Sequence, residues 1–170
     1  TMQKIFANIW FTWSRARTYD IPAWKEWKRK RNDKLAQKIL MKHILFVCIE
    51  NSCRSQMAEA FAHMHGKGII TAHSSGSRPS GKVNERAIEF MKEIAYDLTT
   101  HTSKSLDEIP DVEYEYAITM GCGDECPMIK ARHRIDWGID DPKNMAAEGF
   151  REVRSVIENK VKELIKQLGK

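Results

Sequence analysis

The feature that most limits what this chain can fold into is the stretch 48–55, Cys-Ile-Glu-Asn-Ser-Cys-Arg-Ser, between an apolar run at 43–47 and a helix-like pattern at 56–65. A strand that ends at a cysteine, turns tightly and enters a helix directs several backbone N–H groups and the positive end of the helix dipole at one point. Such a point attracts an oxyanion. A helix N-terminus and a nearby arginine also lower a thiol pKa from ~8.5 to roughly 3.5–7.5, so Cys48 is expected to be a reactive thiolate.

Arg54 and Ser55 supply further donors at the same point. The guanidinium of Arg54, six residues after Cys48, is a planar fork that matches two oxygens of a tetrahedral anion. Ser55 can donate its hydroxyl to the cysteine sulfur. The alternative is a structural cysteine at a strand end beside an unrelated surface arginine, because free cysteine is often a core residue. The combination of strand end, helix start and arginine favours the reactive cysteine.

From residue 43 onward the chain alternates between strand and helix patterns. Strands are expected at 43–47, 69–73, 114–120 and 134–137, helices at 56–65, 84–95 and 147–168, and a short helix opened by a capping box at 105–108. The first of these helices is expected to bury Met57, Ala60, Phe61 and Met64. The alternation predicts a three-layer α/β fold, a four-stranded parallel sheet with helices on both faces, and functional loops beyond the carboxyl ends of the strands.

Residues 1–40 differ in composition from residues 41–170, and we take them as a basic N-terminal extension preceding a single domain. The extension holds four of the five tryptophans and carries a charge of +7, whereas the remainder carries −2. Basic residues interleaved with aromatic ones suit a membrane surface or a nucleic acid. A helix is expected from Asp20, but its apolar stripe is ragged, which favours a solvated appendage that packs on the body or on a second subunit. The extension is expected to take no part in the chemistry.

No apolar run in the sequence reaches the roughly 17–25 residues that a membrane-spanning helix needs. The longest candidate, residues 5–13, lacks a small-residue cleavage site after it, so a signal peptide is not expected. Four cysteines in a chain without an export signal are more often catalytic or metal-binding than structural. The expected location is the cytoplasm.

Two more groups can carry chemistry. Asp141 precedes Pro142 on a loop after an expected strand, where a carboxyl group can protonate a leaving oxygen. Cys122 and Cys126 can supply two electrons by forming a disulfide, a property that a hydrolase does not need. Two alternatives stay open for this pair: a zinc site, which lacks the usual paired spacing, and a redox sensor without turnover. The zinc alternative would combine the pair with Cys53, His101 or His133.

The sequence resembles the low-molecular-weight tyrosine phosphatase superfamily and, within it, the arsenate reductases that use thioredoxin. The matching segments are Ser-Cys-Arg-Ser-Gln-Met-Ala-Glu at 52–59, His-Thr-Ser at 101–103, Met-Gly-Cys-Gly-Asp-Glu-Cys-Pro at 120–127 and Trp-Gly-Ile-Asp-Asp-Pro at 137–142. The resemblance implies Cys48 as nucleophile, Arg54 as oxyanion clamp, Ser55 as thiolate stabiliser and Asp141 as general acid. It also implies an oxyanion-binding loop formed by Ile49, Glu50, Asn51, Ser52, Cys53 and Arg54, with Asn51 fixing the loop shape.

The reaction that the resemblance implies is the reduction of arsenate to arsenite. Cys48 attacks arsenate, Cys122 then attacks the Cys48 sulfur and releases arsenite, and Cys126 carries the oxidation onward as a Cys122–Cys126 disulfide. Thioredoxin or another thiol is the implied reductant, and arsenate or a phosphate-like oxyanion is the implied ligand. No bound cofactor or metal is expected, and the domain itself needs no nucleic acid or membrane.

The sequence departs from the family pattern at three positions near the expected site. Glu50 replaces a common glycine and is expected to point away from the anion, and Lys143 stands where the tyrosine phosphatases have an aromatic residue. Lys104 falls where some reductases have a potassium-binding aspartate, so it would repel or replace the cation. Two alternative functions stay open: a low-molecular-weight phosphatase that hydrolyses phosphate monoesters, and a thiol or metal sensor with a membrane- or nucleic-acid-binding arm.

Overall fold

The computed structural model describes residues 25, 28–32, 41–121 and 129–169. The chain divides into two units, residues 1–40 and residues 41–170. In the first unit the described residues, 25 and 28–32, are helical. In the described parts of the chain, no helix combines the length and the apolar character needed to cross a membrane.

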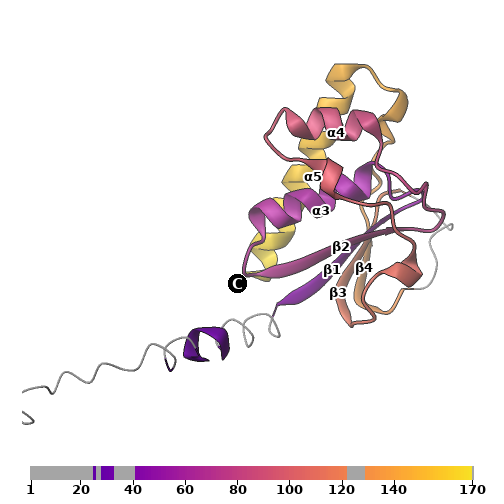
Figure 1. The fold of residues 1–170 in the computed structure, drawn as a ribbon. Helices are drawn as coiled ribbons and strands as arrows, with labels where there is room; N and C mark the ends of the chain where they lie inside the picture. Colours follow the sequence, from indigo (N-terminus) through magenta and orange to yellow (C-terminus); the bar gives the residue numbers. More distant parts are fainter. Residues whose placement is uncertain (1–24, 26–27, 33–40, 122–128, 170) are drawn as a thin grey trace, which may run out of the picture. The chain divides into compact units, whose positions relative to one another are not determined.

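The second unit is built on a sheet of four strands in the order β2-β1-β3-β4, as Figure 1 shows. All neighbouring strands run parallel, which confirms the predicted sheet. Its strands are β1 (Lys42–Cys48), β2 (Ile70–Gly76), β3 (Tyr114–Thr119) and β4 (Ala131–Asp136). Its helices are α3 (Arg54–His65), α4 (Glu85–Lys92) and α5 (Ala147–Leu168), with short 3-10 helices η2 (Leu98–Thr100), η3 (Leu106–Glu108) and η5 (Pro142–Asn144).

The bounds of β1 and β3 differ from the sequence prediction by one residue at most at each end, and those of β2 and β4 by three residues at one end. The pattern placed the end of the second strand at residue 73, before Ser-Ser-Gly at 74–76, because serine and glycine are typical of turns. In the structure β2 continues to Gly76, which pairs with Cys48 at the end of a parallel register that starts at Lys42 and Ile70. Ser74 and Ser75 are fully buried in this ladder. β4 likewise begins at Ala131, three residues before the predicted start.

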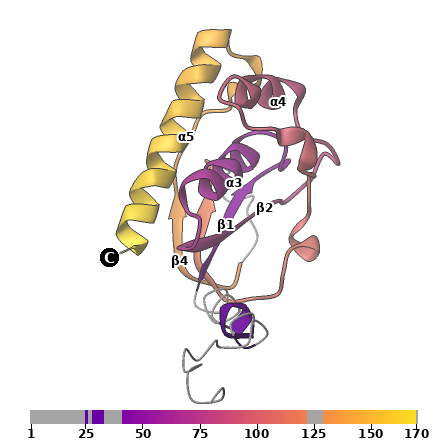
Figure 2. The same cartoon turned by 60° about the vertical axis from the view of Figure 1, so that its left-hand side comes forward.

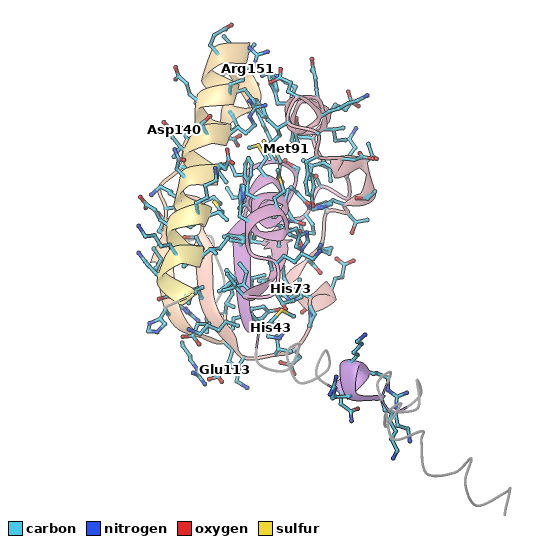
Figure 3. All side chains as sticks on the ribbon, turned by 90° about the vertical axis from the view of Figure 1, so that its left-hand side faces the viewer. His43, His73, Met91, Glu113, Asp140 and Arg151 are labelled. Atoms are coloured by element: carbon cyan, nitrogen blue, oxygen red, sulfur yellow. The ribbon has the colours of Figure 1, made fainter. Side chains whose placement is uncertain are left out.

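Alternate residues of β1 face the two sides of the sheet, as the two-residue period of a strand requires. Ile44 and Phe46 join the larger core with α3, α4 and α5, whereas Leu45 and Val47 pack on the other face with residues near η3. Figure 2 shows α5 running beside α3 on the first face. In Figure 3, Met91 of α4 lies in the space among the three helices, where its side chain is fully buried.

The predicted buried face of α3 is correct at three residues and wrong at one. Met57, Ala60 and Phe61 of α3 are buried as expected, but Met64 is 40% exposed. Met64 lies in the last turn of α3, just before the helix ends at Gly66. The spacing of apolar residues predicts which side of the helix faces the core. It does not predict how far along the helix the core extends.

The strand order places a binding crevice at the end of β1. The chain leaves β1 toward β2 on one side and returns to β3 on the other, so the connections diverge at the carboxyl ends of β1 and β3. Ligands of open parallel sheets bind at this kind of switch point. Cys48 is the last residue of β1 and therefore stands in that crevice.

Candidate active site

The loop between β1 and α3 has a tightly constrained backbone. Asn51 adopts a left-handed conformation, with a φ of 47°, which asparagine tolerates better than most residues. Gly76 of β2 lies directly under the loop, and a Cβ atom there would be 2.6 Å from the carbonyl oxygen of Ile49. The close approach of these two backbone segments requires glycine at this position.

The sulfur of Cys48 contacts the first turn of α3. Cys48 Sγ lies 3.0 Å from Ser55 Oγ, and both side chains are buried. The amide of Asn51 donates to Ser55 Oγ at 2.9 Å. Because that amide occupies an acceptor position on the hydroxyl, the hydroxyl proton is available for the sulfur. This geometry agrees with the predicted placement of Ser55 beside the thiol.

A chain of hydrogen bonds continues from Asn51 to the surface. Gln56 Nε2 donates to Asn51 Oδ1 at 3.0 Å, and Gln56 Oε1 accepts from His101 Nδ1 at 2.9 Å. Since an amide oxygen only accepts, His101 carries its proton on Nδ1, and Nε2 accepts from Tyr96 Oη at 3.0 Å. The exposed His63 contacts Tyr96 Oη through Nδ1 at 3.3 Å. Burial lowers the pKa of His101, which keeps the imidazole neutral as this chain requires.

Arg54 is buried and ties three segments together. Nη1 donates to the carbonyl oxygens of Met120 and Ile139, both at 2.7 Å. Nη2 donates to Asp141 Oδ2 at 3.3 Å. The guanidinium, which the sequence predicted as an anion clamp, is therefore held in position by carbonyls that follow β3 and β4, and this limits its freedom before any anion binds.

Asp141 begins the 3-10 helix η5 and faces the loop. Its Oδ1 accepts from the backbone N–H of Lys143 at 3.2 Å, while Oδ2 pairs with Arg54. Its side chain is 44% exposed, so water and a bound anion can both reach it. Arg86 of α4 holds the turn from behind, donating to the carbonyl oxygens of Lys143 at 2.6 Å and Met145 at 2.7 Å.

A pocket lies between the loop and the Asp141 turn, lined by Cys48, Ile49, Glu50, Ser52, Cys53, Arg54, Asp141 and Lys143. The prediction that Glu50 points away from this site is wrong. The carboxylate of Glu50 accepts a hydrogen bond from the ammonium of Lys143 and another from Ser52 Oγ. The bond from Lys143 is the main reason that the pKa of Glu50 lies below its usual range. The carboxylate therefore lies at the rim of the pocket, neutralised by a lysine.

Cys53 also borders the pocket but differs from Cys48. It is 2% exposed and belongs to the larger core. Burial raises the pKa of its thiol to about 12. Cys53 therefore stays protonated, as expected of a core cysteine without a catalytic role.

Lys104, which was expected to repel or replace a potassium ion, lies beside the carboxylate of Glu59. Its Nζ lies 3.6 Å from Glu59 Oε2, and Glu59 also accepts from Ser74 Oγ at 2.6 Å. The backbone N–H of Lys104 donates to Asn51 Oδ1 at 2.7 Å. The charge of Glu59 is thus balanced by a lysine beside the loop.

Some predicted residues are not brought into the site by the described structure. Cys122 and Cys126 lie outside the described residues. His133 is on β4 with 57% of its side chain exposed, and the described residues contain no cluster of three or more His, Cys, Asp or Glu that could hold a metal ion. Conversely, sequence reasoning missed Arg86 and Tyr96, which reach the site through backbone carbonyls and a histidine and leave no local motif.

Comparison with known families and proteins agrees with this geometry. The family model of the low molecular weight phosphotyrosine protein phosphatases matches residues 43–170. The chain is 37% identical over 131 residues to a glutaredoxin arsenate reductase of Synechocystis sp., covering 75% of this chain and 99% of the relative. It is also 37% identical over 130 residues to arsenate reductase 2 of Staphylococcus saprophyticus, covering 72% of this chain and 95% of the relative.

Solved structures give the same result. An arsenate reductase in the phosphate binding state matches with a TM-score of 0.69 at 37% identity, covering 75% of this chain and 99% of that one. An arsenate reductase in the oxidized state matches with a TM-score of 0.67 at 36% identity, with the same coverage. A thioredoxin-dependent arsenate reductase of Corynebacterium glutamicum matches with a TM-score of 0.60 at 27% identity, covering 81% of this chain and 71% of that one.

Proposed function

The chain belongs to the low molecular weight phosphotyrosine protein phosphatase family, and on that basis we propose that it reduces arsenate to arsenite, with Cys48 as the nucleophile. The observation that carries the proposal is the position of Cys48 Sγ, 3.0 Å from Ser55 Oγ in a pocket that Arg54 and Asp141 also line. The relatives with which the chain shares 37% identity are arsenate reductases, and one was solved in a phosphate binding state.

The first step is formation of a covalent adduct. The Cys48 thiolate attacks the arsenic atom, Asp141 protonates one oxygen, and that oxygen leaves as water. Arg54 binds two of the remaining oxygens, and the hydroxyl of Ser55 stabilises the thiolate before the attack. Asp141 must carry a proton to act as the acid, and its contact with Arg54 Nη2 at 3.3 Å places that carboxyl group beside the clamp. Arsenic is still pentavalent in this adduct.

The second step transfers two electrons from sulfur to arsenic. The thiolate of Cys122 attacks Cys48 Sγ, the sulfur–arsenic bond breaks, and its electron pair stays on arsenic, which leaves as arsenite. A Cys48–Cys122 disulfide results. Cys126 then attacks Cys122 and forms a Cys122–Cys126 disulfide, which restores the Cys48 thiolate. This assignment of the two cysteines rests on the resemblance to thiol-coupled reductases.

An external thiol must reduce the final disulfide. Relatives of this chain include both a glutaredoxin arsenate reductase and a thioredoxin-dependent one. We favour thioredoxin, because a Cys122–Cys126 disulfide is the kind of intramolecular bond that a dithiol reduces by exchange. Such reductants work in a reducing compartment, so we place the activity in the cytoplasm.

A second candidate function is the hydrolysis of phosphate monoesters. Cys48, Arg54 and Asp141 supply a nucleophile, an anion clamp and an acid, and all three line the pocket. Those groups and water suffice for a phosphatase, which would not need Cys122 or Cys126. The two functions therefore differ in their dependence on this cysteine pair.

The test measures arsenate-dependent NADPH oxidation in the presence of thioredoxin and thioredoxin reductase. Parallel samples contain glutathione, glutaredoxin and glutathione reductase, and p-nitrophenyl phosphate hydrolysis is measured on the same protein. We expect Cys48→Ser and Arg54→Ala to abolish both activities. Cys122→Ser and Cys126→Ser should abolish only arsenate turnover, and Glu113→Ala, in an exposed ion pair with Arg132 away from the pocket, serves as the control that retains both.

Multiple turnovers of arsenate by Cys122→Ser or Cys126→Ser would rule out the disulfide relay. Brisk ester hydrolysis without arsenate turnover in either reductant system would establish the phosphatase instead.

A further inference from the structure

Glu50 and Lys143 form an ion pair at the rim of the pocket that the proposed mechanism does not use. Glu50 belongs to the loop between β1 and α3, and Lys143 belongs to the turn that follows Asp141. Their side chains are 45% and 26% exposed, and both residues line the pocket. An exposed pair of this kind adds little to the stability of a fold. Because the pair lines the same pocket as Cys48, it is placed to act on what enters that pocket.

The backbone of Glu50 is fixed from below. Its carbonyl oxygen accepts hydrogen bonds from Ser103 Oγ at 2.9 Å and from the N–H of Ser80 at 3.0 Å. The carboxylate also accepts from Ser52 Oγ at 3.2 Å. The side chain thus starts from an immobile position and has a second partner within the loop.

The backbone of Lys143 is fixed from the opposite side. Its carbonyl oxygen accepts from Arg86 Nη1 at 2.6 Å, and its N–H donates to Asp141 Oδ1 at 3.2 Å. Arg86 in turn lies over the rings of Phe90 and Phe150. Both ends of the ion pair are therefore anchored before a substrate arrives, and the pair spans the pocket between two rigid segments.

We propose that the Glu50–Lys143 pair is the specificity-determining feature of the pocket and favours an inorganic tetrahedral oxyanion over a phosphate monoester. An inorganic oxyanion carries nothing beyond its four oxygens and fits beneath the pair. An ester carries an organic group that must lie at the rim of the pocket. There it would displace water from the charged groups of Glu50 and Lys143 without replacing the hydrogen bonds of that water, which disfavours its binding. This inference deepens the proposed function and rests on the same pocket.

The test compares how well inorganic phosphate and phenyl phosphate protect Cys48 from alkylation by iodoacetamide, with the modified peptide quantified by mass spectrometry. The measured quantity is the ratio of the two half-protecting concentrations. A ratio is needed because removing one charge changes the affinity for every anion, and this general effect cancels between the two ligands. In Glu50→Ala and in Lys143→Ala we expect the ratio to shift toward the ester by roughly tenfold, the scale on which a pocket discriminates by shape.

Two further variants make the test specific. The swap Glu50→Lys with Lys143→Glu rebuilds the pair and should return the ratio toward that of the wild type. Glu113→Ala removes a partner of Arg132 in an exposed ion pair between β3 and β4, and should leave the ratio unchanged. An unchanged ratio in both single variants, a shifted ratio in the swap, or an equal shift in Glu113→Ala would overturn the proposal.

The outcome is independent of arsenate reduction, because alkylation and its protection need only Cys48 and the loop. The NADPH-coupled assay on the same preparations tests the reductase separately. If the wild type does not reduce arsenate but the ratio shifts in Glu50→Ala and Lys143→Ala, only the proposed reaction is overturned. If the wild type reduces arsenate but the ratio is unchanged in both variants, only the role of the ion pair is overturned.

Discussion

Ser55 is the last donor in a hydrogen-bond chain that begins at the surface and ends at a sulfur atom. Each amide in the chain has a single orientation that satisfies both neighbours, so the donors all point toward Cys48. Hydrogen bonds in such a series strengthen one another. At the scale of single residues, the reactivity of the thiol therefore depends on side chains that never touch the substrate.

Replacement of Tyr96 by phenylalanine tests this dependence. The variant leaves His101 Nε2 without its hydrogen-bond donor, so we expect Cys48 alkylation by iodoacetamide at pH 7 to slow by roughly threefold, the value of one modest hydrogen bond. His63→Ala, which removes only the exposed end of the chain, is the control and should have a smaller effect. An unchanged rate in Tyr96→Phe across pH 6 to 8 would contradict the prediction.

The sequence was sufficient to locate Cys48, Arg54 and Ser55, because all three lie within eight consecutive residues and a strand–turn–helix brings them together whatever the rest of the chain does. Asp141 was a candidate from its place after an expected strand and before Pro142, and the resemblance added its role as general acid. Tyr96 could not be found, since its connection to Cys48 passes through five hydrogen bonds, one of which joins His101 to Gln56 across 45 residues of sequence.

At the scale of elements, the Asp141 turn is positioned by helix α4 rather than by its own sequence. Arg86 of α4 donates three hydrogen bonds to backbone carbonyls of the turn, and its guanidinium lies 5.1 Å from the ring centre of Phe150 in α5. The turn, α4 and α5 therefore form one packed group. Asp141 can act as an acid only if this group keeps its place beside the loop.

Arg86→Ala should lower the activity that depends on Asp141 while leaving the reactivity of Cys48 nearly unchanged. The turn loses the three hydrogen bonds that Arg86 donates, so we expect kcat for arsenate and for p-nitrophenyl phosphate to fall by about tenfold or more, within the range of a misplaced general acid. Alkylation of Cys48 should stay within about twofold, since the loop is untouched. Arg151→Ala is the matched control, because Arg151 lies over the same Phe90 ring but bonds Glu93 and not the turn. Equal losses of alkylation and turnover in Arg86→Ala would contradict this division.

The type and order of the helices and strands could be predicted from the spacing of apolar residues. The residues at which several of them begin and end could not. The pattern gave the bounds of α5 correctly, since Phe150, Ile157 and Val161 repeat at helical spacing and are buried. It failed at the end of β2, where Ser74 is buried in the ladder with β1 and its hydroxyl donates a hydrogen bond to Glu59 inside the core. Tertiary partners of this kind are not visible in a local pattern.

At the scale of the whole molecule, two partly buried histidines make stability depend on pH. His73 stacks on His43, and Figure 3 shows the two near one end of the sheet. Burial, with the nearby charge of His43, lowers the pKa of His73, and burial also lowers that of His101, both from 6.5. The unfolded chain then binds more protons than the folded one below about pH 6.5, so stability is fully present above that pH and is lost as the pH falls.

Urea unfolding at pH 7.5 and 5.5 measures this effect. We expect a lower free energy of unfolding at pH 5.5, and a smaller difference between the two pH values in His73→Gln. The lowered pKa of Glu50 does not contribute in this window, because its contribution is lost only below its usual pKa of 4.5. His133→Gln, at an exposed position on β4, should keep the wild-type difference. Equal stability at both pH values would contradict the assignment.

Removal of residues 1–40 tests whether the basic extension takes part in the chemistry. Among the described residues, the site contacts given above lie between residues 48 and 150, and the family match begins at residue 43. We propose that the shortened chain keeps its kcat/KM for arsenate within roughly twofold, as expected of an extension outside the domain. A loss of more than about tenfold, with unchanged unfolding behaviour, would assign the extension a role in the reaction.

The close approach of Gly76 to the backbone of the loop limits which mutations at this position an active protein can carry. Any side chain there would collide with the backbone at Ile49 and Asn51, so a mutation at this codon damages the loop while leaving the cysteine–arginine signature intact. Gene copies that have lost the activity could therefore carry an unaltered Cys48 and still be identified at Gly76. An active natural variant with alanine at this position would show that the loop can shift to make room.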